Sequence, residues 1–185
     1  MRRDRTGFSL IEMLVVICVV SICMAIVAPK FRVSSVQRVN LAADQLVNDL
    51  EQVRTRAITA RGNTRVVITT ATNSYTAYLD DNGDGVINQV ATETAALRGL
   101  QTRILTDNVI FGRGAAPQLA GFPGSGATTF TGNAVDFDTR GVTTPFGARG
   151  VIYFTSSLDN NAVAAVTVTP GGGIRRWVYR GGAWQ

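Results

Sequence analysis

The hydrophobic residues of this 185-residue chain fall into three successive patterns. Residues 8–28, FSLIEMLVVICVVSICMAIVA, form a nearly continuous apolar run that Glu12 interrupts close to its start. At about 1.5 Å per helical residue, this run would extend roughly 31 Å, the thickness of a bilayer's hydrocarbon core. Beyond it the apolar positions become periodic, first at the spacing of a helix and then at that of strands.

The second pattern predicts an amphipathic helix. Apolar or small residues recur at a 3-4-3-4-3-4 spacing, at Val36, Val39, Ala43, Leu46, Leu50, Val53 and Ala57. We expect this stripe to pack on the chain's own sheet, and the alternative is a coiled-coil seam. Gly62 and Asn63 are expected to end the helix because both tolerate the left-handed C-terminal conformation. A single helix from Phe8 to about Arg61 would be roughly 80 Å long.

After Gly62 the period changes to two, and Thr, Val, Tyr and Phe dominate, which is typical of strands. The predicted strands are Thr64–Thr70, Ser74–Leu79, Leu97–Leu105, Asn108–Phe111, Ala134–Asp138, Val151–Thr155, Ala162–Thr169 and Ile174–Arg180. Gly112–Gly126 is rich in Gly and Pro and predicts a long exposed loop. The fold class is therefore α+β, with a long N-terminal spine helix on an antiparallel β-sheet head and no internal repeat or second domain.

Composition excludes several functions. The net charge is +5, of which the first seven residues contribute +2, and the remaining +3 is too modest to indicate nucleic-acid binding by charge alone. The chain has no His, which removes His-based acid–base catalysis, nucleophile systems and metal sites. The only cysteines, Cys18 and Cys23, lie in the apolar run and cannot cross-link the head.

The N-terminus allows three interpretations. A cleaved secretory signal has an apolar stretch of about 7–15 residues, shorter than the 21 found here. A simple membrane anchor fits the length, and Arg2, Arg3 and Arg5 would hold the N-terminus in the cytoplasm. Neither explains Glu12, because an ionisable group inside a membrane costs on the order of 2.5 kcal/mol or more.

The third interpretation accounts for Glu12. The string Gly7-Phe8-Ser9-Leu10-Ile11-Glu12 resembles the processing site of type IV prepilins and type II secretion pseudopilins. The resemblance implies that a prepilin peptidase cuts after Gly7 and methylates the new amino group of Phe8. It divides the chain into a leader (1–7), a transmembrane and filament-core helix (8–28), the amphipathic second half of the spine (29–61) and a β-rich periplasmic head (62–185). The protein would cross the inner membrane once before entering a pilus or pseudopilus.

The same resemblance gives roles in assembly to Glu12 and Pro29. The Glu12 carboxylate would pair with the Phe8 amine of a neighbouring subunit, because a buried carboxylate needs a partner or becomes protonated. Pro29 removes a helical hydrogen bond. It would make a kink at the membrane surface, where Lys30 and Arg32 can reach water, or a flexible segment that lets subunits stack, and the two are not exclusive.

The head resembles the GspH/FimT-type pseudopilins. The stretch Ala134–Gly141, AVDFDTRG, is similar to that family's strand and turn, and Gly173–Arg180 stands where the family ends with a basic strand. The resemblance implies a structural minor subunit of a type IV pilus or a type II secretion pseudopilus, and a major pilin is an alternative. Its partners would be other pilin or pseudopilin subunits, the prepilin peptidase and the inner-membrane assembly platform.

Two segments suggest ligands. Asp80, Asn82, Asp84 and Gly85 match the opening of a calcium loop, although the twelfth position is Ala91 rather than Glu. The competing interpretation is a hairpin turn between Tyr75–Leu79 and Val86–Val90. No other cofactor is expected.

The second segment is the C-terminal strand. Arg175, Arg176 and Arg180 are interleaved with aromatic residues there, which would suit a nucleic acid. The resemblance to minor pilins of DNA-uptake systems implies DNA as the partner, although their Gly-Arg-x-Arg pattern is not reproduced, because Ile174 follows Gly173. Residues 174, 176, 178 and 180 would share one face and residues 175, 177 and 179 the other, which favours an ordinary edge strand with solvated arginines.

The sequence predicts no enzyme. It offers no nucleophile–base pair, paired-carboxylate cleft or phosphate loop. Asp136 and Asp138 share a strand face, and we interpret them as part of a polar surface.

Overall fold

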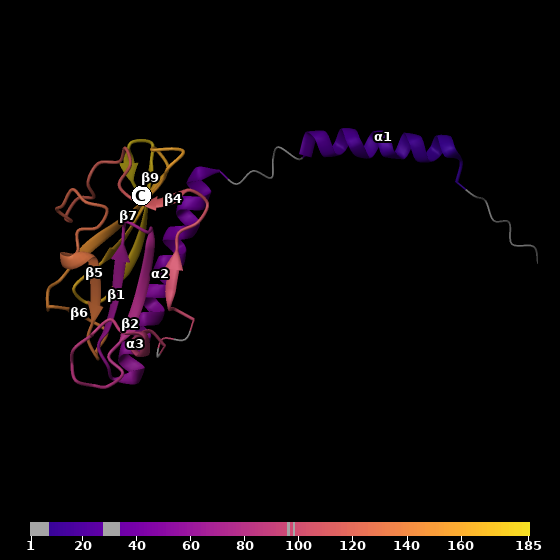
Figure 1. The fold of residues 1–185 in the computed structure, drawn as a ribbon. Coiled ribbons are helices and arrows are strands. Elements are labelled where there is room, and N and C mark those ends of the chain that lie inside the picture. The colour runs from indigo at the N-terminus through magenta and orange to yellow at the C-terminus, as the bar shows by residue number, and fades with distance from the viewer. Residues whose placement is uncertain (1–7, 28–33, 96, 98) are drawn as a thin grey trace, which may run out of the picture. The chain divides into compact units, whose positions relative to one another are not determined.

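The computed structural model describes residues 8–27, 34–95, 97 and 99–185. The chain divides into two compact units, residues 1–34 and residues 35–185, and each is described by itself. The predicted spine corresponds to two helices, α1 (Leu10–Val27) and α2 (Ser35–Ala60) (Figure 1). Gly7, Pro29, Lys30 and Arg32 lie outside the described residues, so the single uninterrupted helix, the cleavage site and the kink stay predictions.

The apolar stripe of α2 confirms the amphipathic helix. Val39, Ala43, Leu46, Leu50, Val53 and Ala57 are all buried in the head's core, and Val36 is half-buried against it. The core also contains residues of both sheets, so the stripe is covered by the chain's own strands. The coiled-coil alternative is therefore wrong.

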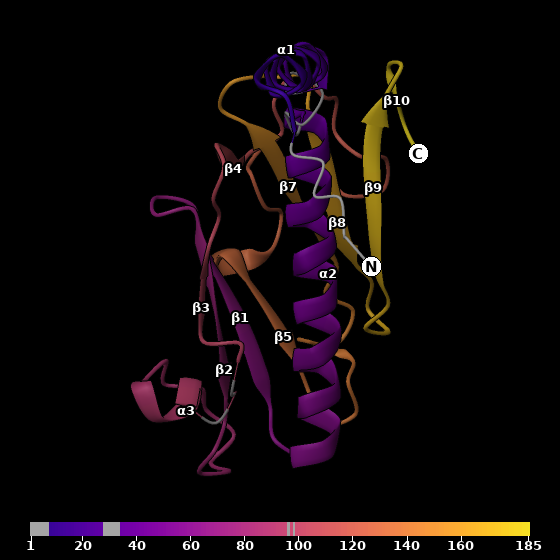
Figure 2. The same cartoon turned by 90° about the vertical axis from the view of Figure 1, so that its right-hand side faces the viewer.

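The head consists of α2 and two antiparallel five-stranded sheets. The first has the order β3-β2-β1-β5-β6 and the second β10-β9-β8-β7-β4. Their strands are β1 (Thr64–Thr69), β2 (Ser74–Leu79), β3 (Thr102–Ile104), β4 (Val109–Phe111), β5 (Ala134–Phe137), β6 (Thr143–Thr144), β7 (Gly150–Ser156), β8 (Val163–Val168), β9 (Ile174–Arg180) and β10 (Ala183–Trp184). Figure 2 looks onto α2, with β1, β2 and β3 on one side of it and β9 and β10 on the other.

Burial differs between the two sheets. In β1, Thr64, Val66 and Ile68 are buried, whereas the intervening Arg65 and Val67 are only half-buried, the alternation expected of a sheet covered on one face. Every residue of β7 and β8 is buried. Their two faces belong to different hydrophobic clusters, the main core and a smaller cluster around Val151, Tyr153, Ala165 and Leu119.

Strand prediction failed between β2 and β4. Leu97–Leu105 was expected to be one strand, but only Thr102–Ile104 is. The amide of Leu97 donates to the carbonyl of Thr94, and that of Leu100 donates to the carbonyl of Leu97. These turn hydrogen bonds occupy the amides that a strand ladder would need, and both leucines are buried in a loop instead.

Two loop predictions also need correction. Val86–Val90 is not a strand and leads into a short helix, α3 (Ala91–Ala95), so the hairpin interpretation is wrong. The loop 112–126 is irregular as predicted but only partly exposed, because Leu119 is buried and its amide donates to the Tyr153 hydroxyl at 2.9 Å. The loop therefore covers the outer face of the second sheet.

The end of α2 differs from the prediction in its details. Arg61, rather than Gly62 or Asn63, adopts the left-handed conformation, with φ of 55°. Gly62 is required for a different reason, since a Cβ there would lie 2.9 Å from the Asp80 carbonyl oxygen. The helix end and the end of β2 thus meet backbone to backbone, and the Asp80 amide donates to the Asn63 carbonyl.

Candidate functional site

Helix α1 is apolar on every side. Its large apolar side chains, from Leu10 to Met24, are between 49% and 83% exposed. An amphipathic helix would protect one side, but in α1 no face is covered among the described residues. Such a helix needs an apolar environment supplied by lipid or by other helices. No helix of the described residues meets the length and hydropathy expected of a membrane span.

Glu12 lies in the first turn of α1. The carbonyl of Ser9 accepts hydrogen bonds from the amides of Glu12 and Met13, at 3.0 and 3.2 Å, so the helix starts directly after Ser9. A carboxylate in a first turn is favoured by the helix dipole. The Glu12 side chain forms no ion pair or hydrogen bond with another described residue. Its position, one turn from Phe8, leaves it available to a group outside this helix.

One line of exposed residues on α2 carries no charge, although Asp44, Glu51 and Arg56 flank it. This line follows helical spacing and consists of Gln37, Leu41, Gln45, Asn48, Gln52, Thr55 and Thr59. Exposed helix faces are normally rich in charged residues, and protein interfaces are depleted of Lys, Glu and Asp. We call this line the neutral ridge. Sequence reasoning missed it, although the absence of charge at seven helically spaced positions was visible in the sequence.

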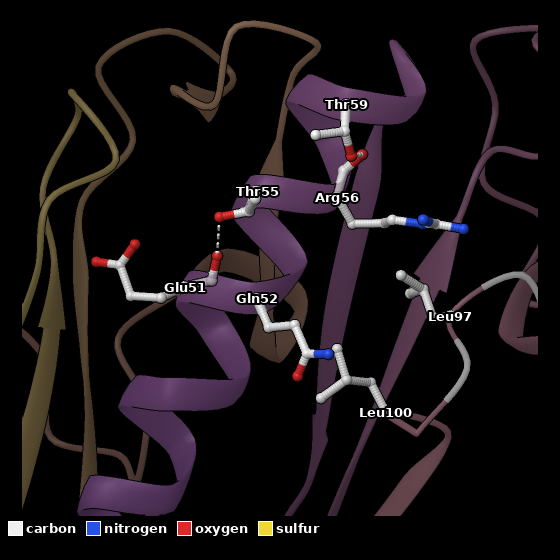
Figure 3. A pocket seen from close by; sticks show the side chains of 7 residues that line it. All are labelled: Glu51, Gln52, Thr55, Arg56, Thr59, Leu97 and Leu100. Carbon is white, nitrogen blue, oxygen red and sulfur yellow. Dashed lines mark hydrogen bonds between the residues drawn. The ribbon is translucent and has the colours of Figure 1, made fainter.

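A groove lies beside the neutral ridge (Figure 3). It has a volume of about 500 Å³ and is lined by Glu51, Gln52, Thr55, Arg56, Thr59, Leu97 and Leu100. Gln52 and Arg56 extend toward the two leucines, whereas Glu51 points away from them. The groove therefore has one apolar wall, made by the two leucines, and one polar helical wall that includes the charged Glu51 and Arg56.

Asp49 is the main polar residue that sequence reasoning missed. It is 4% exposed and accepts hydrogen bonds from Tyr75 Oη at 2.6 Å, Gln45 Nε2 at 2.8 Å and Arg103 Nε at 3.1 Å. Burial, and then the hydrogen bond to Asp49, raises the pKa of Tyr75 above its usual value. The signal was an acidic residue next to Leu50 on the apolar stripe. Asp49 ties α2 to β2 and β3, which is a structural role.

The C-terminal hairpin does not gather its arginines on one face. Arg176 Nη1 donates to Asp44 Oδ2 on α2 at 2.6 Å, whereas the Arg175 guanidinium lies 5.1 Å from the Trp177 ring centre on the opposite face. The alternation predicted for residues 174–180 is thus confirmed, but the predicted edge strand is wrong, because β9 lies between β8 and the two-residue β10. Arg175, Arg176 and Arg180 are all exposed, and their contact with DNA stays a prediction.

The oxygens of the predicted calcium loop are used locally. The Asp80 carboxylate accepts the amides of Gly83 and Gly85, each at 2.8 Å, and Asp84 Oδ1 accepts the amide of Val86. Asn82 Nδ2 donates to Asp84 Oδ2 at 2.8 Å. These hydrogen bonds shape the loop. The part of the chain that the structure describes has no cluster of three or more His, Cys, Asp or Glu side chains able to hold a metal. Calcium binding stays a prediction.

Asp136 and Asp138 each pair with an arginine. Asp136 accepts two hydrogen bonds from Arg65, both at 2.7 Å, and this pairing raises the pKa of Arg65. Burial would raise the pKa of Asp138, but hydrogen bonds from the side chain and amide of Arg140 lower it overall. Both carboxylates are therefore paired with arginines on the polar side of the first sheet and in the turn that follows β5.

Comparison with known families identifies the N-terminus. Residues 2–28 match the model of the prokaryotic N-terminal methylation motif, so the recognition made on Gly7, Phe8 and Glu12 is confirmed. The matched segment is 27 residues long and includes nearly all of α1. No curated protein sequence matches the chain.

Two solved structures share the fold. The minor pseudopilin EpsH of the Vibrio cholerae type 2 secretion system is 12% identical, with a TM-score of 0.50 over 76% of this chain and 97% of EpsH. The type IV minor pilin FimU of Pseudomonas aeruginosa is 10% identical, with a TM-score of 0.51 over 80% of this chain and 92% of FimU. The predicted α+β fold, a helix on an antiparallel head, is therefore confirmed as the fold of these minor subunits.

Proposed function

We propose that this chain is a structural minor subunit of a type IV pilin-like filament and has no catalytic activity. The observation that carries the proposal is α1, an apolar helix exposed on every side that lies within a methylation motif and holds one carboxylate in its first turn. The fold shared with a minor pseudopilin and a minor pilin supports a role in assembly, since both of these are subunits of such systems.

Proteolytic maturation would create an amine that can pair with the Glu12 carboxylate. Cleavage between Gly7 and Phe8 would leave a methylated amine at Phe8, one helical turn from Glu12 in the same subunit. When α1 packs among the helices of neighbouring subunits, the Glu12 carboxylate leaves water, which is costly for a charged group without a partner. The amine of an adjacent subunit's Phe8 would neutralise it and set the axial register of the two helices. Pro29 would contribute a bend or flexible turn to the spine.

We further propose that residues 8–28 anchor the precursor in the inner membrane. The three arginines of the leader would keep the N-terminus in the cytoplasm, and the head would lie in the periplasm. The partners are neighbouring pilin or pseudopilin subunits, the prepilin peptidase and the assembly platform. The neutral ridge of α2 is the surface of the head best suited to contact such neighbours, because it is exposed, helical and uncharged.

Processing and assembly are tested together in a host that carries the complete machinery. Intact-mass spectrometry of the wild-type chain is expected to show an N-terminus at Phe8 with one added methyl group. Glu12→Ala should be processed in the same way but be lost from sheared filaments. Asp81→Ala, which removes an exposed carboxylate outside α2, is the matched control and should assemble normally. Incorporation of Glu12→Ala at the wild-type level would contradict the role of Glu12.

The identity of the filament is tested by deleting the gene. Loss of surface pili that the wild-type gene restores would assign the chain to a type IV pilus. Retention of pili with loss of secreted proteins would assign it to a type II secretion pseudopilus. The ratio of this chain to the principal subunit in sheared filaments distinguishes a minor from a major pilin, and we expect a ratio far below one.

DNA capture by the head is a second candidate. It is favoured by the exposed Arg175 and Arg180 and disfavoured by the ion pair of Arg176 with Asp44. Purified chain should bind duplex DNA in a salt-dependent way if this function is present, and the triple replacement of Arg175, Arg176 and Arg180 by Gln should abolish it. Absence of binding at low salt would exclude it.

A further inference from the structure

A cleft of about 410 Å³ lies on the face of the first sheet that points away from α2. Its floor is a row across three strands, because Arg65 of β1 is in register with Asp136 of β5 and Asp136 with Thr144 of β6. Figure 1 shows β5 and β6 on the side of the head remote from α2. The volume lies in the range of small-molecule sites, roughly 300–1,000 Å³. Nothing in the proposed assembly role uses this cleft.

The floor presents donors and acceptors in a fixed arrangement. Arg65 Nε and Nη2 both donate to Asp136 at 2.7 Å, so this ion pair is bidentate and rigid. It occupies two of the five guanidinium N–H groups and leaves lone pairs on both carboxylate oxygens. The side chains of Arg65 and Asp136 are 31% and 17% exposed, so both still reach the cleft. A ligand hydroxyl could donate to Asp136 while its neighbour accepts from Arg65.

The walls add hydroxyls, apolar surface and one uncompensated charge. Thr129 Oγ1 accepts the amide of Val151 and keeps its own proton to donate, and Thr131 is exposed at the rim. Pro145 and Ala148 supply apolar surface. Arg149 is exposed and forms no ion pair with another described residue. Because Arg65 is neutralised by Asp136, the cleft carries a net charge of +1.

Other ligand classes fit less well. Phe130 cannot stack on a nucleobase, because it is buried and packs against Gly150, where a Cβ would lie 2.7 Å from the ring. An added peptide strand is disfavoured, since the amide of Thr143 on β6 already donates to the Pro170 carbonyl at 3.1 Å. Inorganic phosphate would occupy only a small part of the cleft and leave the paired floor without a partner.

We propose that this cleft binds an acidic sugar, a uronic acid residue of a saccharide. Adjacent ring hydroxyls would contact the Arg65–Asp136 pair and the threonine hydroxyls, the C–H face would lie on Pro145 and Ala148, and the sugar carboxylate would pair with Arg149. This inference is independent of the proposed filament role, since the cleft is on the sheet face opposite α2.

The test uses the full chain in a zwitterionic detergent that has no sugar headgroup. Isothermal titration calorimetry with trigalacturonic acid should show saturable binding that weakens as salt is added. Arg149→Gln should weaken binding about tenfold or more, as expected for the loss of a charge-assisted contact. Arg140→Gln, an exposed arginine outside the cleft that pairs with Asp138, is the matched control and should change affinity less than about twofold.

Two further measurements separate binding from folding and from charge alone. Thr144→Val preserves shape, and it should weaken binding several-fold without moving the thermal unfolding midpoint. Galactotriose, which lacks the carboxylates, should bind at least about tenfold more weakly than trigalacturonic acid. The proposal is overturned by an absence of saturable binding, by equal affinity for the two saccharides, or by an unchanged affinity in Arg149→Gln. Filament incorporation of Arg149→Gln should stay normal, so failure here leaves the assembly role untouched.

Discussion

The two helices α1 and α2 follow each other in the chain, yet they treat apolar residues in opposite ways. In α1 the apolar side chains face every direction and are about half exposed or more. In α2 most of them form one stripe whose members, from Val39 to Ala57, are at most 1% exposed, and Leu41 and Ile58 are the exceptions. The difference shows that the spacing of apolar residues along a helix indicates what kind of surface will cover it. A stripe is matched to the chain's own sheets, whereas an all-round apolar helix is matched to surroundings that other molecules provide.

The sharpest test of this contrast is a pair of equal substitutions. Leu46→Ala removes a fully buried side chain of the α2 stripe and should lower the free energy of unfolding of the head by about 2–5 kcal/mol. Leu14→Ala in α1 should change it by less than about 0.5 kcal/mol, because Leu14 is 54% exposed. Denaturant titration of the full chain in micelles, followed by fluorescence of Trp177 and Trp184, measures both. Similar losses of unfolding free energy in the two variants would contradict the inference that only the α2 stripe stabilises the head.

The second prediction concerns the polar residue of the stripe. Asp49→Ala should destabilise the head by about 2–3 kcal/mol, because it leaves the buried Tyr75 hydroxyl without its acceptor and Arg103 without its ion pair. The same denaturant titration measures the loss. Asp44→Ala is the control, since Asp44 pairs with Arg176 at the surface and should contribute less than about 1 kcal/mol. Equal losses in the two variants would mean that burial does not determine how much each carboxylate contributes to the free energy of unfolding.

The third prediction tests the end of α2. Gly62→Ala should cost about 1–2 kcal/mol, because its Cβ would meet the Asp80 carbonyl oxygen at 2.9 Å and one of the two backbones must shift. Gly171→Ala is a matched control, since a Cβ there has no heavy atom within 4 Å and Gly171 does not adopt positive φ. Thermal unfolding of both variants distinguishes close backbone approach from a general intolerance of alanine at loop glycines.

The smallest expected effect depends on pH. The pKa of Asp138 is lowered in the folded protein, so its carboxylate contributes stability above the unfolded pKa of about 4 that is lost as the pH falls through the lower, folded value. The contribution should stay below about 1 kcal/mol, because Arg140 is 76% exposed. Asp138→Asn should therefore lose stability at neutral pH and flatten the acid side of the stability profile. An unchanged acid profile would count against the Arg140 pairing.

Most of the fold could be predicted because its elements have strong, regular patterns. The α2 stripe and strands β1, β2, β5, β7, β8 and β9 follow from periodicity and agree with the structure within a few residues. The segment 86–105 could not be predicted. Its helix α3 is five residues long, and Glu93 supports it by accepting the amides of Asn88 and Gln89. Such local contacts have no periodicity.

The N-terminal motif could be predicted from the sequence more completely than the surfaces of the head. Gly7, Phe8 and Glu12 stand in a short linear pattern that matches the methylation motif, so their roles could be predicted from the sequence alone. The surfaces of the head depend on residues that are distant in the chain. Arg65 and Asp136, for example, are 71 positions apart and meet only because β1 pairs with β5. Residue types indicate that such pairs can form, but the strand order decides which ones do.

The buried core of the head begins at the start of α2, and every strand that covers it lies farther along the chain. The core of the head contains no residue of α1, so the head can fold whatever environment surrounds α1. In the assembly role that we propose, α1 would move from lipid to a protein environment while the head keeps the same fold. The free energy required for that transfer would then depend on α1 alone and not on refolding of the head.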